Sequence, residues 1–308
     1  MFNQTKAAII VIMIIIPLSI IAIWNSSRIE EFPINDIENH KLVALASFYP
    51  IFEFTKEIGK DKVNVSMLVP DGMEPHDWEP SIQDLKLIQS ADIIIINGIG
   101  FENWIEDIIK INSEIKIIDT SNGINVTNKS DMDKDNHVTT LADPHIWLSP
   151  VLAKIQVKNI EEGLKELDKE NSQFYHDSSE NYIRKLDMLD FKIKTELSNC
   201  TKNFIAFHNA FTYFATEYGL NQYTVVSDEP HGEPTSKNIE KIINLAKELK
   251  IKVIFTEEGV DQRTAQVIAR EINGKVLTLS PIEIGDKNST YIEKMNENLA
   301  NLKEALCN

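Results

Sequence analysis

The sequence predicts an α/β protein with two lobes, each built on a four-stranded parallel sheet, joined by one long helix. Short apolar runs of strand length alternate with helical segments over residues 42–118, and the same alternation restarts at residue 204. A single long helical segment separates the two series. Such alternation is typical of parallel sheets covered by helices. No sequence repeat relates the two halves, so the predicted likeness is one of architecture only.

The composition is that of a globular protein with an acidic surface. The chain has 308 residues, enough for two domains, and 25% of them are charged and 43% apolar. Acidic residues outnumber basic ones 47 to 31, the net charge is −16, and no basic run is present. A nucleic-acid-binding function is therefore not expected. The two cysteines, Cys200 and Cys307, either form one disulfide or remain free thiols.

The N-terminal segment indicates export. Residues 7–24, after Lys6, are 18 residues without a charge, at the lower limit for crossing a bilayer of about 30 Å. A secretory signal has the same pattern. We expect a membrane anchor or signal segment at 1–24 and a polar tether at 25–40, with the rest of the chain outside the cytoplasm. The remaining predicted parts are an N-terminal lobe at 41–170, a linking helix at 171–198 and a C-terminal lobe at 199–308.

The first lobe shows clear strand and helix signals. Ser81 is predicted to cap a helix, because Asp84 completes a capping-box pattern three residues on. The wholly apolar run at 93–96 is expected of a strand covered on both faces. Residues 119–143 are polar without an apolar period and predict a surface loop. Strands are expected at 42–48, 63–69, 93–96 and 115–118, and helices at 50–59, 81–89 and 101–110.

Two helices are expected between the lobes, one ending near Leu167 and a longer one from about 171 to 198. The longer one carries apolar residues at helical spacing. At 1.5 Å per residue it would span about 42 Å, more than one lobe requires. In the second lobe, strands are expected at 204–207, 223–226, 251–255 and 276–279, and helices at 209–218, 236–249 (capped by Ser236), 261–272 and 290–306.

The segment Gly72–Ser81 combines a histidine, three carboxylates and a tryptophan with two prolines, directly after the second strand. Pro75 and Pro80 exclude a regular helix or strand, so the segment is predicted to be an irregular loop. Taken alone, such a loop is as consistent with a solvated connector as with a ligand site.

Four potential metal ligands follow strand ends: His76, His145, His208 and Glu283. Ligands of open α/β sheets bind beyond the carboxyl ends of the strands. Two ligands from each lobe are therefore predicted to converge on the cleft between them. Taken singly, each histidine is also consistent with a packed or hydrogen-bonded core residue, and the glutamate with a surface acid. The joint arrangement favours a site.

Four motifs carry a resemblance to a known family: Glu74–Ser81 (EPHDWEPS), Asn97–Trp104 (NGIGFENW), Asp143–Leu148 (DPHIWL) and Phe207–Phe211 (FHNAF). With them the chain resembles, from about residue 40 to its end, the metal-binding lipoprotein family of zinc and manganese ABC importers, the cluster A-I substrate-binding proteins. The resemblance implies two Rossmann-like lobes, a rigid linking helix and one metal ion in the cleft. By position it implies His76, His145 and His208 as three ligands.

The fourth ligand varies within that family. Many members have an aspartate where this chain has Ser280, which is not a comparable anionic ligand. The segment Ser280–Glu283 is instead similar to the zinc-binding branch, whose fourth ligand is a glutamate. The resemblance therefore implies Glu283.

The chemistry of this donor set favours zinc. Three imidazoles and one carboxylate form a tetrahedral shell suited to Zn²⁺, with bonds of about 2.0–2.2 Å. Mn²⁺ prefers more oxygen ligands and is the weaker expectation. Copper also binds such nitrogens, so geometry and availability have to exclude it.

Several acids near these positions have candidate supporting roles. Glu74, Asp77 and Glu79 are expected to orient His76 or to raise the local cation concentration, although Asp77 is nearly as consistent with a structural cap. Glu257 and Glu258 follow a strand end and are reserve ligand candidates.

Two other histidines are not assigned to the site. In the resembling family the loop before the second histidine is often histidine-rich, but here residues 119–143 hold only His137. A solvated loop is favoured there over a metal-collecting one. His231 is taken as a surface residue.

The leading functional prediction is an extracytoplasmic component of an ABC importer that captures Zn²⁺ and delivers it to a membrane permease driven by an ATPase. The chain is expected to be a monomer and not an enzyme. Alternatives are a manganese-binding component, a surface adhesin and a zinc hydrolase. A hydrolase would need an open metal position and a general base, whereas four protein ligands leave no place for a reacting water. The long helix would limit hinge closure, so release is expected to involve local loop rearrangement.

Overall fold

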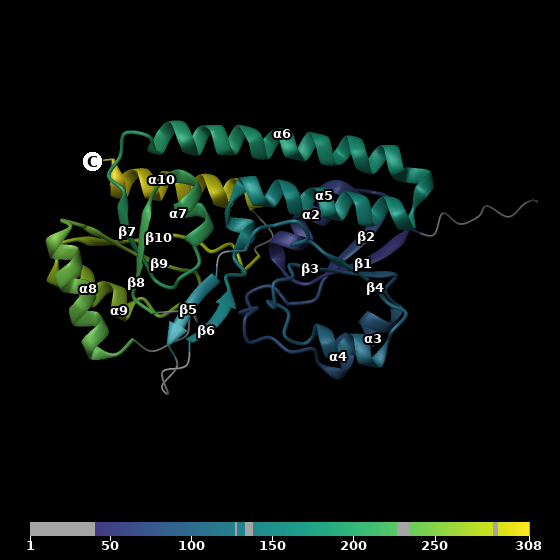
Figure 1. Cartoon of the computed structure of the whole chain (residues 1–308), viewed down its shortest axis with the longest axis horizontal. Coiled ribbons are helices and arrows are strands. Elements are labelled where there is room, and N and C mark those ends of the chain that lie inside the picture. Colours follow the sequence, from purple (N-terminus) through teal and green to yellow (C-terminus); the bar gives the residue numbers. More distant parts are fainter. Residues whose placement is uncertain (1–40, 127, 133–137, 227–233, 286–288, 308) are drawn as a thin grey trace, which may run out of the picture. The chain divides into compact units, whose positions relative to one another are not determined.

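Two parallel sheets organise the molecule (Figure 1). The computed structural model describes residues 41–126, 128–132, 138–226, 234–285 and 289–307. The expectations for residues 1–40, for His137 and for His231 lie outside these ranges. Within them, no helix combines the length and apolar character that a membrane span requires.

The first sheet has four parallel strands in the order β2-β1-β3-β4. Strand β3, one of the two inner strands, is buried at every position, as its wholly apolar sequence predicts. The strands are β1 (Leu42–Ala46), β2 (Val63–Met67), β3 (Ile93–Ile96) and β4 (Lys116–Asp119), and the helices are α2 (Tyr49–Gly59), α3 (Ile82–Ser90) and α4 (Ile105–Ile111). Helix α3 begins with the predicted capping box between Ser81 and Asp84.

The second sheet also has four parallel strands, in the order β10-β9-β7-β8. Gly219 ends α7 in the left-handed conformation (φ 64°), which glycine adopts without a side-chain penalty. The strands are β7 (Asn203–Ala206), β8 (Asn221–Thr224), β9 (Val253–Thr256) and β10 (Lys275–Thr278), and the helices are α7 (Thr212–Tyr218), α8 (Ser236–Glu248), α9 (Arg263–Glu271) and α10 (Tyr291–Leu306).

Helices α5 (Pro150–Leu167) and α6 (Ser172–Leu197) connect the sheets, preceded by the short 3₁₀ turns Ile146–Leu148 and Lys169–Asn171. Helix α6 has 26 residues, or about 39 Å at 1.5 Å per residue. It packs against α5 and α2 of the first lobe and against α10 and α7 of the second (Figure 1). The fold class predicted from the sequence is confirmed.

One buried apolar cluster is shared by the two lobes. It runs from the first sheet through α5 and α6 to α10, and a smaller cluster lies around α8 and α9. Contacts join residues 41–308 into a single unit. The lobe boundaries given above therefore stay a prediction.

The two cysteines form a disulfide. Cys200 follows the C-terminal end of α6 and Cys307 follows that of α10, and the structure joins their sulfur atoms. Of the two alternatives left open by the sequence, the structure therefore shows the disulfide and not the free thiols. The bridge ties the linking helix to the last helix of the chain.

Three local predictions were wrong. Residues 128–142 contain an antiparallel hairpin, β5 (Asn128–Met132) and β6 (Val138–Ala142), where a loop without strands was expected. Pairing in a hairpin rests on backbone hydrogen bonds, so it needs no apolar period. Helix α4 begins four residues later than predicted, at Ile105, and Thr235 rather than Ser236 caps α8, with its hydroxyl accepting from Asn238 N.

Candidate metal centre

Four side chains from separate parts of the chain meet at one point. His76, His145, His208 and Glu283 each offer one ligand atom, and these atoms all lie within 4.8 Å of one another. The structure thus brings together the four residues singled out in the sequence. Their role as ligands is a separate matter, which depends on geometry and chemistry.

The four residues come from loops at the carboxyl ends of strands. His76 lies in the loop between β2 and α3, and His145 lies between β6 and the turn Ile146–Leu148. His208 follows β7, and Glu283 follows β10. The loop holding His76 has no helix or strand between Met67 and Ile82, as its prolines predicted.

Four of the six separations between the facing atoms are near those of a small tetrahedral shell. Glu283 Oε1 lies 3.2 Å from Nε2 of His76, 3.2 Å from Nε2 of His145 and 3.9 Å from Nε2 of His208. Nε2 of His145 and His208 are 3.3 Å apart. A tetrahedron with bonds of about 2.0–2.1 Å has edges of about 3.3 Å. These four separations suit an ion of that size, and the remaining pairs of ligand atoms lie within 4.8 Å of each other.

Two of the histidines are oriented by buried carboxylates. Nδ1 of His145 lies 2.7 Å from Asp143 Oδ1, which also accepts from the His145 backbone N–H at 3.1 Å. Nδ1 of His208 lies 2.7 Å from Glu257 Oε2, and the backbone N–H of His208 donates to Glu257 Oε1 at 3.0 Å. An Nδ1–H held by a carboxylate leaves Nε2 free to bind a metal and raises its basicity.

His76 is held differently and lies nearer the solvent. Its ring meets the ring of Phe101 edge-on, with centroids 4.9 Å apart. Its backbone N–H donates to Glu74 Oε1 at 3.2 Å. Its side chain is 16% exposed, whereas the side chains of the other three residues are at most 1% exposed. The open side of the centre is therefore the His76 side.

The backbone that carries Glu283 adopts an unusual conformation. Ile282 is fully buried with φ 60°, a left-handed conformation that β-branched residues rarely adopt. The Ser280 hydroxyl accepts from Ile282 N at 3.1 Å, and Asn298 bonds to both backbone groups of Ser280 at 2.7 Å. Trp147 Nε1 donates to Pro281 O at 2.7 Å. Ser280 therefore shapes the turn instead of facing the centre.

Burial and neighbouring charges shift the pKa values of the groups around the centre. Burial alone would raise the pKa of Glu283, but the three histidines outweigh it and hold that pKa well below its usual range. Burial alone would lower the pKa of His208, but the carboxylates of Glu257 and Glu283 raise it to about 9. Burial and the charge of Glu283 raise the pKa of Glu74 to about 8. Without a metal, His208 is protonated at neutral pH and Glu283 is ionised.

The acids that were expected to support the centre differ in their positions and partners. Glu74 is half-buried beside the centre, whereas Asp77 and Glu79 are exposed. Glu257 is a hydrogen-bond partner of His208 rather than a replacement ligand, and Glu258 pairs with Lys294 at 3.3 Å.

Sequence reasoning missed Asp143 and the orienting position of Glu257. Asp143 stands two residues before His145 in the Asp-Pro-His motif, so the spacing could have suggested it. Glu257 is 49 residues from His208 and becomes its neighbour only because β7 and β9 pair.

The sequence matches the family model of ZnuA, the periplasmic component A of the zinc-uptake complex, over residues 45–305. The chain belongs to this family. The predictions of an exported solute-binding component of a zinc ABC importer, outside the cytoplasm and not an enzyme, are therefore confirmed.

Similar proteins agree with this assignment. The chain is 37% identical over 285 residues to the high-affinity zinc uptake system protein ZnuA of Bacillus subtilis, covering 88% of this chain and 89% of that one. It is 33% identical over 289 residues to the zinc-binding protein AdcA of Streptococcus pyogenes, covering 85% of this chain but only 56% of AdcA. The structure resembles that of the laminin-binding protein Lmb of Streptococcus agalactiae, with a TM-score of 0.79, 30% identity, and 86% of this chain and 99% of that one covered.

Proposed function

We propose that His76, His145, His208 and Glu283 together bind one Zn²⁺ ion, which is the transported solute. The observation that carries this proposal is the grouping of three imidazole nitrogens around one carboxylate oxygen, at separations of 3.2–3.9 Å. A buried shell of three nitrogens and one oxygen suits Zn²⁺, whereas Mn²⁺ prefers more oxygen ligands.

The chain then delivers the ion to an ABC permease powered by a cytoplasmic ATPase. The membership of the zinc-uptake family supports this part of the proposal. We further propose that the protein acts as a monomer, tethered to the membrane through its N-terminal segment.

Metal competition on the purified full-length protein tests the metal assignment. Elemental analysis after dialysis against equal free Zn²⁺ and Mn²⁺ is expected to find about one zinc per chain and little manganese. Predominant manganese would contradict the proposal.

A paired substitution tests the fourth ligand. Glu283→Gln removes the charge and is expected to weaken zinc binding by at least about a hundredfold, because replacing even a group that only orients a ligand costs 10–100-fold. The control Glu79→Gln changes an exposed acid of the His76 loop and should bind zinc as the wild type does. Equal affinity in Glu283→Gln and the control would remove Glu283 from the site.

Attachment to a host matrix is the second candidate function. It is favoured by the likeness to Lmb, which is described as a bifunctional protein with adhesin and metal-transporting activity. Deletion of this chain that spares growth in zinc-limited medium but abolishes binding to immobilised laminin would favour attachment. The reverse result would favour transport alone.

A further inference from the structure

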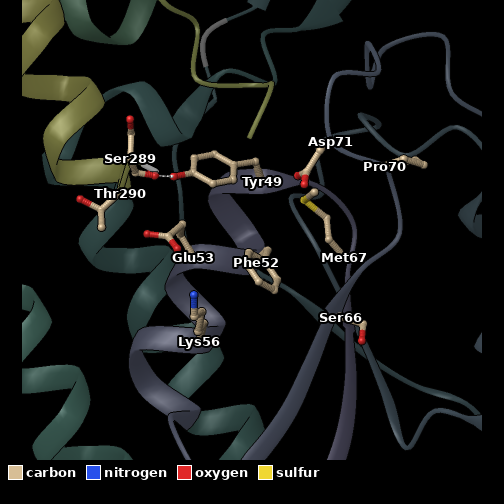
Figure 2. A pocket seen from close by; sticks show the side chains of 10 residues that line it. All are labelled: Tyr49, Phe52, Glu53, Lys56, Ser66, Met67, Pro70, Asp71, Ser289 and Thr290. Atoms are coloured by element: carbon tan, nitrogen blue, oxygen red, sulfur yellow. Dashed lines mark hydrogen bonds between the residues drawn. The ribbon is translucent and has the colours of Figure 1, made fainter. Parts of the chain in front are cut away.

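A cavity of about 520 Å³ lies where α2 and the end of β2 meet the start of α10. Figure 2 shows its walls, with Tyr49, Phe52 and Glu53 on α2, Asp71 beyond β2, and Ser289 and Thr290 before α10. None of the four metal-centre residues lines it. The cavity is therefore a second feature of the molecule with chemistry of its own.

Glu53 is a buried acid that faces this cavity, and within the described part of the chain no ion pair involves its carboxylate, although Lys56 on the same helix acts on it electrostatically. Glu53 is only 7% exposed, and burial raises its pKa. Among the described residues its carboxylate accepts a single hydrogen bond, from Tyr291 N at a long 3.4 Å. A buried carboxylate with so little compensation is costly unless a positive group joins it.

Asp71 adds a second carboxylate on the opposite wall (Figure 2). No ion pair involves Asp71 within the described part of the chain, and it is exposed. The one lysine of the lining, Lys56, has its Nζ over the ring of Phe52, 5.4 Å from the centroid. The ring of Tyr49 forms another wall. Two carboxylates beside an aromatic ring form a setting suited to a guanidinium, which pairs with carboxylates and stacks on rings.

The overall charge points to a basic partner. The chain has a net charge of −16, which favours association with a positively charged surface. Its transport role, as a component of an importer, requires contact with a membrane permease.

The cavity wall touches the segment that carries Glu283. A Cβ added at Gly285 would lie 2.5 Å from Tyr49 Cδ2 and 3.2 Å from Asp71 Oδ1, so both wall residues pack directly on this glycine. Tyr49 OH also donates to Ser289 O at 2.5 Å. Gly285 is two residues from Glu283. A shift of Tyr49 or Asp71 therefore reaches the backbone of the proposed fourth ligand.

We propose that the cavity binds an arginine side chain of the permease, and that its occupation weakens zinc binding through Tyr49, Asp71 and Gly285. This inference rests on the proposed function, because it takes Glu283 as a zinc ligand and the permease as the recipient. The arginine would enter between the two carboxylates and move the wall that packs on Gly285. Docking would then promote release of the ion.

A small probe tests the coupling in solution. N-acetyl-arginine methylamide supplies the guanidinium, and N-acetyl-citrulline methylamide has nearly the same shape without the charge. We expect the arginine probe at saturation to lower zinc affinity about fivefold or more, and the citrulline probe to leave it unchanged. Zinc affinity is measured by competition with a chelating indicator on the full-length protein.

Matched variants locate the effect. Glu53→Gln is expected to abolish the arginine effect while keeping zinc affinity without probe and the melting temperature at wild-type values. Glu57→Gln is the control, because Glu57 lies on the same helix, pairs with Lys185 at 2.9 Å and does not line the cavity. An equal arginine effect in both variants, or none in the wild type, would overturn the proposal.

Uptake tests the identity of the occupant. In cells that lack the native chain, Glu53→Gln and Asp71→Asn are each expected to reduce zinc uptake about tenfold or more, since each removes one of the two carboxylates that pair with the arginine. Wild-type uptake in both variants, with the arginine effect intact in the wild-type protein, would mean that the occupant is a free solute and would overturn the permease assignment.

Failure of the proposed zinc site can be distinguished from failure of the cavity proposal. If Glu283→Gln bound zinc normally, the assignment of Glu283 as a zinc ligand would be wrong. The methyl resonance of Met67, which lies in the cavity wall, would still show whether the arginine probe binds. A shifted Met67 resonance without any change in zinc affinity would contradict the coupling alone.

Discussion

At the residue scale, the carboxylates behind the histidines should have a measurable effect on the proposed metal centre. Glu257 holds Nδ1 of His208 at 2.7 Å and contributes to its raised pKa. We predict that Glu257→Gln weakens zinc binding by about 10–100-fold, the range for loss of a group that orients a ligand. Chelator competition measures the affinity, and the His208 ring resonances should titrate at lower pH than in the wild type.

The neighbouring acid is a matched control. Glu258 pairs with Lys294 instead of a histidine, so Glu258→Gln should keep wild-type zinc affinity. A loss of affinity in Glu258→Gln as large as that in Glu257→Gln would indicate a general structural effect.

Zinc binding should release protons. The pKa of His208 is about 9 without metal, and a histidine has to lose its proton to bind the ion. We therefore predict that zinc affinity rises with pH up to about 9, and that about one proton is released per zinc at pH 7.5. Calorimetric titration in buffers of different ionisation enthalpy measures this number. Binding without proton release at pH 7.5 would contradict the raised pKa.

The stability of the metal-free protein should change in the opposite direction. The pKa of His208 in the folded chain is raised from 6.5 to about 9. Protonated His208 therefore stabilises the folded chain fully below pH 6.5, and this contribution is lost as the pH rises through 9. The pKa of Glu74 is raised from 4.5 to about 8. Its contribution to the stability of the folded chain is likewise lost as the pH rises through 8. The melting temperature without zinc should therefore fall between pH 6.5 and 9. A constant or rising value over this interval would show that these shifts are absent.

At the scale of elements, the disulfide between the ends of α6 and α10 should contribute substantially to stability. It closes a sequence separation of 107 residues, and loops of this size lose much chain entropy when closed. We predict that the double variant Cys200→Ser/Cys307→Ser lowers the free energy of unfolding by about 2–5 kcal/mol. Denaturant titration measures the change. Neither cysteine contacts the metal centre, so zinc affinity should stay at the wild-type value.

The strands and helices show where sequence reasoning succeeds. The wholly apolar strand β3 and the capping box at Ser81 were predicted because each depends on neighbouring residues alone. The hairpin of β5 and β6 was missed because its sequence is polar, and strand pairing was not expected there. The start of α4 was missed because Glu102, inside the predicted helix, instead accepts hydrogen bonds from Asn97 N and Gly98 N.

Part of the candidate site was predictable from the sequence, and part of it was not. The four converging residues were predictable from their places after strands, together with the resemblance of their motifs to a known family. The conformation of Ile282 was not predictable, because it depends on the hydrogen bond that Ile282 N donates to the Ser280 hydroxyl and on the contact of Ser280 with Asn298 of α10. Only the folded chain brings these groups together.

At the scale of the whole molecule, several buried hydrogen bonds join the two lobes. Tyr291 OH donates to Trp147 O at 2.5 Å, and Tyr213 OH donates to Asp143 O at 2.8 Å. Together with α6 and the shared apolar cluster, these bonds oppose a hinge opening of the lobes. An opened form would leave these backbone acceptors without their partners.

We therefore predict that zinc binding changes local loops and leaves the arrangement of the lobes unchanged. Hydrogen–deuterium exchange should show zinc-dependent protection in the loop Gly72–Ser81 and little change in α6. Small-angle scattering should give the same radius of gyration with and without zinc. A clear decrease of that radius on zinc addition would indicate hinge closure and contradict the prediction.

The uneven exposure of the four side chains bears on the rate at which the ion can leave. Water reaches the centre from the side of His76, because the other three side chains are at most 1% exposed. The first metal–ligand bond to be exchanged should therefore be that of His76, and a competing chelator has to approach from the same direction. Dissociation would be stepwise, with His145, His208 and Glu283 holding the ion until the His76 bond has opened. A narrow chelator should accordingly extract zinc faster than a bulky one of equal affinity.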